Sequence, residues 1–151
     1  MIYTLTIPGE PVTKARPRVT QAGFTYTPAK TKNYETFVRE LFYAEHGQVM
    51  MDGAIKAEII AYFPIPKSTA KKLHVQMATE QYPHIKSRDA DNVAKSVLDA
   101  LNDVAYKDDC QIADLLVLKR YSELPRVTLA LSKIEYGGEH SEFISEQIGL
   151  T

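Results

Sequence analysis

Aspartate is concentrated in one short stretch of this chain, and that stretch limits what the chain can fold into more than any other feature. Residues 88–111 read RDADNVAKSVLDALNDVAYKDDCQ. Six aspartates fall within 21 positions: Asp89, Asp91, Asp99, Asp103, Asp108 and Asp109. Carboxylates this close repel one another unless something positive lies among them. A hard cation such as Mg²⁺ takes oxygen ligands and is often held by a few carboxylates plus substrate phosphates, an arrangement typical of phosphoryl chemistry.

The first half of this stretch has the apolar period of a helix. Val93, Val97, Leu101 and Val104 recur at helical spacing, which predicts a helix over about residues 91–104. The opposite face is polar and carries Asp91, Lys95, Asp99 and Asn102. Two interpretations stay open at this point. The face is either solvated, with i,i+4 ion pairs and Asp89 as the N-cap, or it is part of a metal site.

Asp108 and Asp109 form a pair in a short turn before a strand. Such a pair can direct one carboxylate back toward the N-terminus of the helix, where it would complete a three-carboxylate site with Asp89 and Asp91. The alternative is an aspartate-rich turn, because aspartate binds nearby backbone N–H groups. The helix face, the N-terminal acids and the pair together favour the metal site.

Other kinds of site fit the sequence poorly. The spacing after Asp89 lacks the third ligand and the glycine of an EF-hand loop, and there is no phosphate-binding GxxxxGK[ST] loop. The four histidines are scattered, and His84 is expected at the surface more than in a site. Cys110 is a poor candidate nucleophile because neighbouring acids would raise its pKa. A single cysteine permits no intramolecular disulfide and indicates a reducing compartment.

Charge is segregated along the chain although the net charge is only −1. Residues 10–32 contain five basic side chains and one acidic, a balance of +4, and residues 64–88 have the same balance. Residues 89–114 carry seven aspartates and two lysines, a balance of −5. An acidic patch between basic segments suits a metal-centred site that grips a polyanion.

The first basic segment contains KARPR, in which Lys14, Arg16 and Arg18 alternate with small or proline residues. Alternate side chains of an extended loop could project together toward phosphates. Phe24 and Tyr26 lie close by and could stack on an exposed base. The alternative is a solvated basic loop with both aromatic rings packed on the core.

The remaining patterns predict one α+β (mixed α/β) domain over residues 1–135, with a small mixed sheet of about four strands flanked by helices. The order is β-α-β-α-α-β-β, and the ranges are about 3–8, 28–46, 54–64, 70–79, 91–104, 111–121 and 126–134. Thr27 and either Ser68 or Thr69 are the expected N-caps of the first two helices. Residues 136–151 are expected to be a tail that is flexible or forms a short helix over 141–148. No apolar run approaches the about 18 residues of a membrane span, and the start lacks a signal peptide, so a cytoplasmic protein is expected.

Taken together, three short motifs resemble the RusA family of Holliday-junction resolvases, which is common in bacteria and their prophages. They are Asp89-x-Asp91-Asn92-x-x-Lys95, Asp99-Ala100-Leu101 and Asp108-Asp109-x-Gln111. The basic start from Pro11 to Arg18 resembles the form found in many phage-derived members. The resemblance spans roughly residues 2–134, so the tail lies outside it.

This resemblance implies a site. Asp89, Asp91 and Asp109 would hold Mg²⁺, or Mn²⁺ in its place, and Lys95 would be the catalytic lysine. The link between Leu101 and Asp108 is about one residue shorter than in the best-known branch of the family, so Asp108 stays open as the third ligand. Further candidate site residues are Asp99 and Asn92, and the candidate DNA-backbone contacts are Lys14, Arg16, Arg18, Lys86 and Arg88.

The resemblance also implies an activity and partners. It implies a homodimer that makes paired symmetric nicks in four-way DNA junctions during recombination and repair, acting on nucleoid DNA of a bacterium or phage. A two-fold dimer presents two sites to two opposed strands. The alternatives are a metal-dependent nuclease of flaps or single strands, and a non-catalytic protein that binds DNA junctions.

Overall fold

Four strands form one mixed sheet in the computed structural model, which describes residues 1–86 and 88–135. Their spatial order is β1 (Ile2–Pro8), β6 (Arg126–Lys133), β4 (Ile55–Pro64) and β5 (Ile112–Ser122). The pairs β1–β6 and β6–β4 are antiparallel, whereas β4 and β5 are parallel neighbours. A parallel pair needs a long crossover, and here the crossover carries two helices. The predicted α+β class and mixed four-stranded sheet are confirmed.

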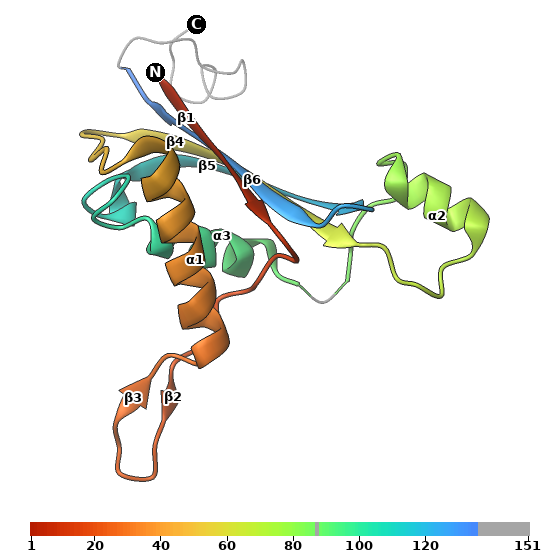
Figure 1. Cartoon of the computed structure of the whole chain (residues 1–151), viewed down its shortest axis with the longest axis horizontal. Helices are drawn as coiled ribbons and strands as arrows, with labels where there is room; N and C mark the ends of the chain where they lie inside the picture. The colour runs from red at the N-terminus through yellow and green to blue at the C-terminus, as the bar shows by residue number, and fades with distance from the viewer. Residues whose placement is uncertain (87, 136–151) are drawn as a thin grey trace, which may run out of the picture.

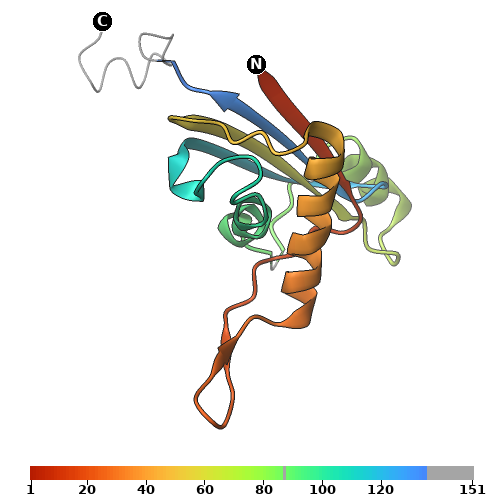
Figure 2. The ribbon, with the colours of Figure 1, turned by 60° about the vertical axis from the view of Figure 1, so that its left-hand side comes forward.

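Of the three α-helices in the described residues, two cover one face of this sheet. α1 (Ala29–His46) and α3 (Ala90–Ala100) lie side by side against it, while α2 (Lys71–Ala78) lies beyond one end (Figures 1 and 2). Strand side chains alternate between faces, so the core side of β4 carries Ile55, Ala57, Ile59 and Ala61, all buried as the sequence predicts. The amphipathic stripe of α3 packs on them through Val93 and Val97. In the described residues, no helix covers the opposite face of the sheet.

The basic segment that contains KARPR, expected from the sequence to be a loop, contains a hairpin. β2 (Arg18–Val19) pairs with β3 (Thr25–Tyr26) in antiparallel fashion. Gly23 has a φ of 85° in the turn, a conformation that glycine adopts without strain. The hairpin projects past the N-terminal end of α1 and away from the sheet (Figure 2). Strands of two residues are too short to leave a period in the sequence, which is why the hairpin was missed.

Helix boundaries differ from the predictions at three places. Pro28, not Thr27, is the N-cap of α1, and Ala70, not Ser68 or Thr69, is the N-cap of α2; neither helix has a side-chain cap. α3 ends at Ala100 instead of continuing to residue 104, because the chain turns at Asp103 with a φ of 64°. The predicted end of α1 at residue 46 is confirmed, and Gly47 follows as the C-cap with a φ of 74°.

Two further expectations concern the ends and the environment of the chain. The tail, with its predicted short helix over 141–148, lies outside the described residues. Within the described part of the chain, no helix is long and apolar enough to cross a membrane.

Candidate active site

Asp89 and Asp91 lie at the N-terminal end of α3 with exposed side chains. Asp89 occupies the N-cap position, yet its side chain makes no capping hydrogen bond; it accepts one from Asn92 Nδ2 at 3.3 Å. From β5, Lys119 Nζ donates to the backbone carbonyl of Arg88 at 2.7 Å. This bond anchors the backbone just before Asp89 to the sheet. The carboxylates of Asp89 and Asp91 are therefore exposed to solvent on a fixed backbone.

Gln111 holds the turn that precedes β5. The turn is a short 3₁₀ helix, η1 (Asp109–Gln111). Gln111 Oε1 accepts from the backbone N–H of Asp108 at 3.2 Å, and its Nε2 donates to the carbonyl of Met51 at 2.9 Å. Asp108 Oδ1 accepts from the N–H of Cys110 at 2.9 Å and so caps the turn. The Asp108 side chain is therefore used within the turn itself.

Asp109 is placed differently from Asp108. Its backbone N–H donates to Asn102 Oδ1 at 2.8 Å, and its carboxyl group lies within hydrogen-bonding reach of Asp99 and Asp108. Partial burial, followed by these two acidic neighbours, raises the pKa of Asp109 to about 6. The second aspartate of the pair is thus directed toward α3, but it meets Asp99 in the last turn of that helix and not the N-terminus expected from the sequence.

Asp99 is the centre of a small network of charges. Its carboxylate forms ion pairs with Lys14 and Lys95, each with an N–O distance of 3.3 Å, and Lys14 also pairs with Glu35 of α1. Burial acts to raise the pKa of Asp99, but hydrogen bonds with Asp109, Lys95 and Lys14 outweigh it and the pKa is lowered. Likewise, burial acts to lower the pKa of Lys14, but Glu35 and Asp99 outweigh it and the pKa is raised.

The structure gathers the acids at two places along α3 instead of one. Asp91 and Asp99 are two helical turns apart, about 12 Å along the axis. Asp109 meets Asp99, whereas Asp89 lies beyond Asp91. In residues 1–86 and 88–135, no three His, Cys, Asp or Glu side chains are arranged to hold one metal ion. The set Asp89, Asp91 and Asp109 is therefore not assembled, and its role as a metal site stays a prediction.

The donor set nevertheless suits a hard divalent cation. All the acidic side chains offer oxygen ligands, with neither histidine nor thiolate among the candidate ligands. Asp109 lies close to both Asp99 and Asp108, and a positive charge near Asp109 would relieve the repulsion between these acids.

The five candidate DNA-backbone contacts fall into different environments. The Lys14 side chain is only 18% exposed and is fully engaged in its ion pairs, whereas Arg16, Arg18 and Lys86 are exposed. Arg88 is half-buried next to Asp89. The structure therefore brings Lys14 into the acidic network and leaves the arginines of the same segment at the surface.

Phe24 and Tyr26 do not pack on the core. They are 73% and 47% exposed on the projecting hairpin. The alternative that these rings are buried is wrong, because the hairpin carries them away from the sheet and helices (Figure 1).

Sequence reasoning missed two groups that support the site, Glu35 and Lys119. Glu35 lies on a helix with other acidic residues, and Lys119 on a strand, so neither stands out by spacing. His84 is buried rather than at the surface and stacks on Phe63 with ring centroids 4.3 Å apart. The raised pKa expected for Cys110 is confirmed, with desolvation first and Asp108 next among its causes.

Comparison with known proteins agrees with the motifs. Residues 8–132 match the family model of the endodeoxyribonuclease RusA, a range that includes every candidate site residue. A Bacillus subtilis (strain 168) protein named uncharacterized protein YqaN is 35% identical over 135 residues, which cover 85% of this chain and 94% of that relative. This chain belongs to the RusA family of endodeoxyribonucleases.

Proposed function

We propose that this protein is a Mg²⁺-dependent endonuclease that resolves four-way DNA junctions by paired, symmetric phosphodiester hydrolysis. The observation that carries the proposal is the carboxyl group of Asp109, which η1 places beside Asp99 of α3, whose own carboxylate forms ion pairs with Lys14 and Lys95. Family membership supports nuclease activity on DNA. Its place of action would be the cytoplasm, on bacterial or phage DNA.

Asp89, Asp91 and Asp109 would hold the cation, with Asp99, Asp108 and Asn92 as further candidates. Mn²⁺ is expected to substitute, because it accepts the same oxygen ligands. When bound, a divalent cation supplies activation of water and neutralisation of charge at the scissile phosphate. The capping role of Asp108 within η1 supports Asp109 as the ligand from this pair.

Lys95 can act on the phosphate directly. It lies one helical turn from Asp91, and its side chain is 57% exposed. An ammonium group there can neutralise negative charge that develops on the leaving oxygen. The exposed Arg16, Arg18 and Lys86, with Arg88, would bind the DNA backbone without reading its sequence.

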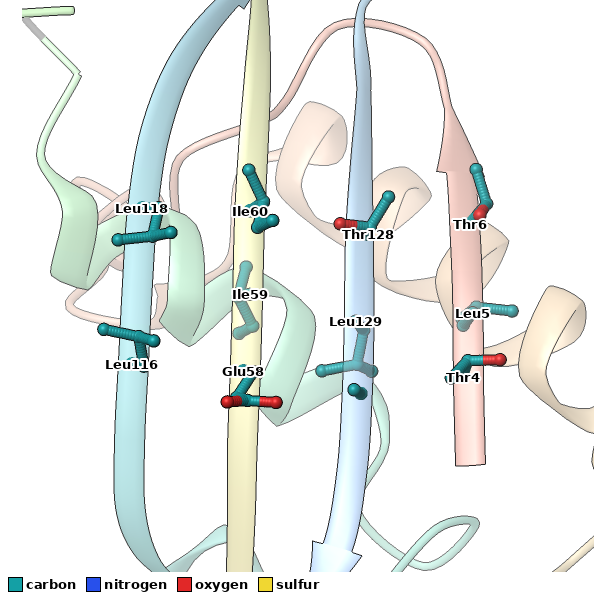
Figure 3. A pocket seen from close by; sticks show the side chains of 11 residues that line it. Thr4, Leu5, Thr6, Glu58, Ile59, Ile60, Leu116, Leu118, Thr128 and Leu129 are labelled. Carbon is teal, nitrogen blue, oxygen red and sulfur yellow. The ribbon is translucent and has the colours of Figure 1, made fainter. Parts of the chain in front are cut away.

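We further propose a two-fold homodimer that forms through the open face of the sheet. This face is hollowed by a cavity of about 400 Å³ and carries Ile60, Leu116 and Leu118 beside a row of threonines and Glu58 (Figure 3). An exposed apolar patch with a polar rim is typical of a protein interface. All four strands of the sheet contribute to it. Because α3 lies on the other side of the sheet, both acidic sites would stay open to DNA.

A mobile four-way junction, incubated with and without Mg²⁺ and resolved on a denaturing gel, tests the proposed function. We expect nicks at symmetric positions on two opposed strands, and only with the cation. Faster cutting of a flap or a single strand would favour a general nuclease. Tight binding without cutting in Mg²⁺ or Mn²⁺ would favour a non-catalytic junction-binding protein.

A further inference from the structure

A second cavity, of about 370 Å³, lies beside the acidic site. It is bounded by the segment at residues 10–15, the base of the β2–β3 hairpin, the first turn of α1, and Arg88. Arg88 directly precedes Asp89, so the cavity borders the residues proposed to hold the cation. Its volume lies at the small end of the range for ligand pockets, which is about 300–1,000 Å³.

The rim of this cavity is positively charged. Arg18, Lys30 and Arg88 reach it from three separate segments, against one acidic residue, Glu10. Within residues 1–86 and 88–135, none of these three cations forms an ion pair with a carboxylate. The first turn of α1 adds no acidic residue and no side-chain cap. Such a rim favours phosphate groups.

The wall of the cavity is apolar and fixed in place. Pro11, Val12, Ala15 and Pro28 line it. Three hydrogen bonds hold the segment at residues 12–15: Ser96 Oγ to the Val12 carbonyl (2.6 Å), Lys14 N–H to the Asn92 carbonyl (2.9 Å) and Ala15 N–H to Thr31 Oγ1 (3.2 Å). A preformed apolar wall suits the flat face of a nucleobase, because little order is lost on binding.

We infer that this cavity receives one unstacked nucleotide of the DNA strand next to the scissile phosphate. The base lies against Pro11, Val12 and Pro28, and Arg18, Lys30 and Arg88 hold its phosphates. The shape of the cavity would then set which bases are preferred at the cut site. This inference rests on the proposed function, because it takes the bound polyanion to be DNA that is positioned for cutting.

The test uses junctions in which 2-aminopurine, whose fluorescence rises when it leaves the base stack, replaces one base at a time around the mapped cut site. The full-length protein binds them with EDTA in place of Mg²⁺, so that the strands stay intact. We expect a rise at one nucleotide next to the cut site. Ala15→Leu, which narrows the cavity, removes the rise, while junction binding, measured by anisotropy, persists. Ala44→Leu, on the exposed side of α1 away from the cavity, is the matched control and retains it.

Lys30→Gln gives a second variant that cannot disturb the core, because Lys30 is exposed. The 2-aminopurine fluorescence should also fail to rise with this variant. If Ala15→Leu melts at a lower temperature than wild type, the result with Lys30→Gln is the one that tests the inference. A junction that is bound and cut normally but shows no rise at any position overturns this inference and leaves the proposed function standing. A rise that survives in Lys30→Gln and in folded Ala15→Leu also overturns it. A junction that is neither bound nor cut in Mg²⁺ overturns both.

Discussion

At the scale of single residues, Asp109 carries the clearest physical signature. Its pKa of about 6 in the folded chain exceeds the ordinary value of 3.8. The stability linked to this group is therefore fully present below about pH 4 and is lost as the pH rises through 6. The cause is burial together with the neighbouring Asp99 and Asp108, so removing the charge of Asp109 removes the effect.

The first prediction follows from that sign. Asp109→Asn should raise the melting temperature of the metal-free protein at pH 8 and leave it nearly unchanged at pH 4, because an amide carries no charge and can still donate to Asp99. Thermal unfolding in EDTA between pH 4 and 8 measures this. Asp114→Asn, at an exposed position of β5, is the control and should give no pH-dependent difference. A parallel shift at all pH values would contradict the assigned cause.

The second prediction concerns cutting. Asp89→Asn, Asp91→Asn and Asp109→Asn should each lower single-turnover junction cleavage at least ~10²-fold, because charge at the cation site is lost. Junction binding should survive or tighten, since a carboxylate facing phosphate is gone. Asp108→Asn should do less, because that side chain caps η1. An inactive Asp108→Asn beside an active Asp109→Asn would reverse the assignment within the pair.

The third prediction separates two basic residues of one segment. Arg16→Ala should lower the salt slope of junction binding by about 0.9, the value for one lost phosphate contact. Lys14→Ala should leave that slope close to wild type and slow cleavage instead, because the charge of Lys14 is already matched by Glu35 and Asp99. Anisotropy titrations from low to high salt, paired with single-turnover rates, give both readouts. A slope that falls equally in the two variants would place Lys14 on phosphate.

These residues show which parts of the candidate site could be predicted from the sequence. The aspartates stand out by number and spacing, whereas the contact of Asp109 with Asp99, in the last turn of α3, was not predicted. The partner of Lys14 could not be predicted, because Glu35 and Asp99 meet it only when α1 and α3 lie side by side. The motif implies that Asp89, Asp91 and Asp109 lie together. In the structure Asp109 lies at Asp99, which is two helical turns along α3 from Asp91.

At the scale of elements, strands and helices with a long apolar period were predicted correctly, and short or unperiodic features were not. β4 alternates over its whole length, and α3 keeps a helical stripe, so both are plain in the sequence. The β2–β3 hairpin rests on a few local bonds, such as that from Thr20 N–H to the Phe24 carbonyl at 2.8 Å. Such bonds leave no pattern of residue types to find.

The fourth prediction concerns that hairpin. Replacing residues 19–25 with a short glycine–serine linker should leave the melting temperature nearly unchanged, because Val19 and Phe24 are exposed and bury little surface. Junction affinity should fall, because Phe24 is lost and Arg18 is no longer held in place by the hairpin. Melting and binding curves of the same preparation test both parts. A large loss of stability would show that the hairpin is part of the fold.

At the scale of the whole molecule, the proposed dimer interface is the face of the sheet that α1 and α3 leave uncovered. The fifth prediction is that Ile60→Glu or Leu118→Glu yields a monomer by light scattering, because a carboxylate would be buried in the proposed interface. Leu124→Glu, exposed in the β5–β6 connection, is the matched control and should remain a dimer.

Cleavage products report on the same dimer. Wild-type protomers mixed with Asp91→Asn protomers should give junctions nicked on one strand instead of paired duplex products. A monomeric mass for the wild type, at concentrations where junctions are still resolved, would rule out the dimer.

The parallel pairing of β4 with β5 has a consequence for the life of the chain in the cell. Every acidic candidate from Asp89 to Asp109 lies in the single crossover between these two strands. During synthesis, a chain that has emerged only as far as α3 carries Asp89 and Asp91 without Asp109, and without the strand whose Lys119 anchors the segment before them. Domains generally fold as units, and contacts across a long crossover form late. With the proposed site, the chain would therefore be inactive during synthesis and would become able to cut DNA only once it is nearly complete.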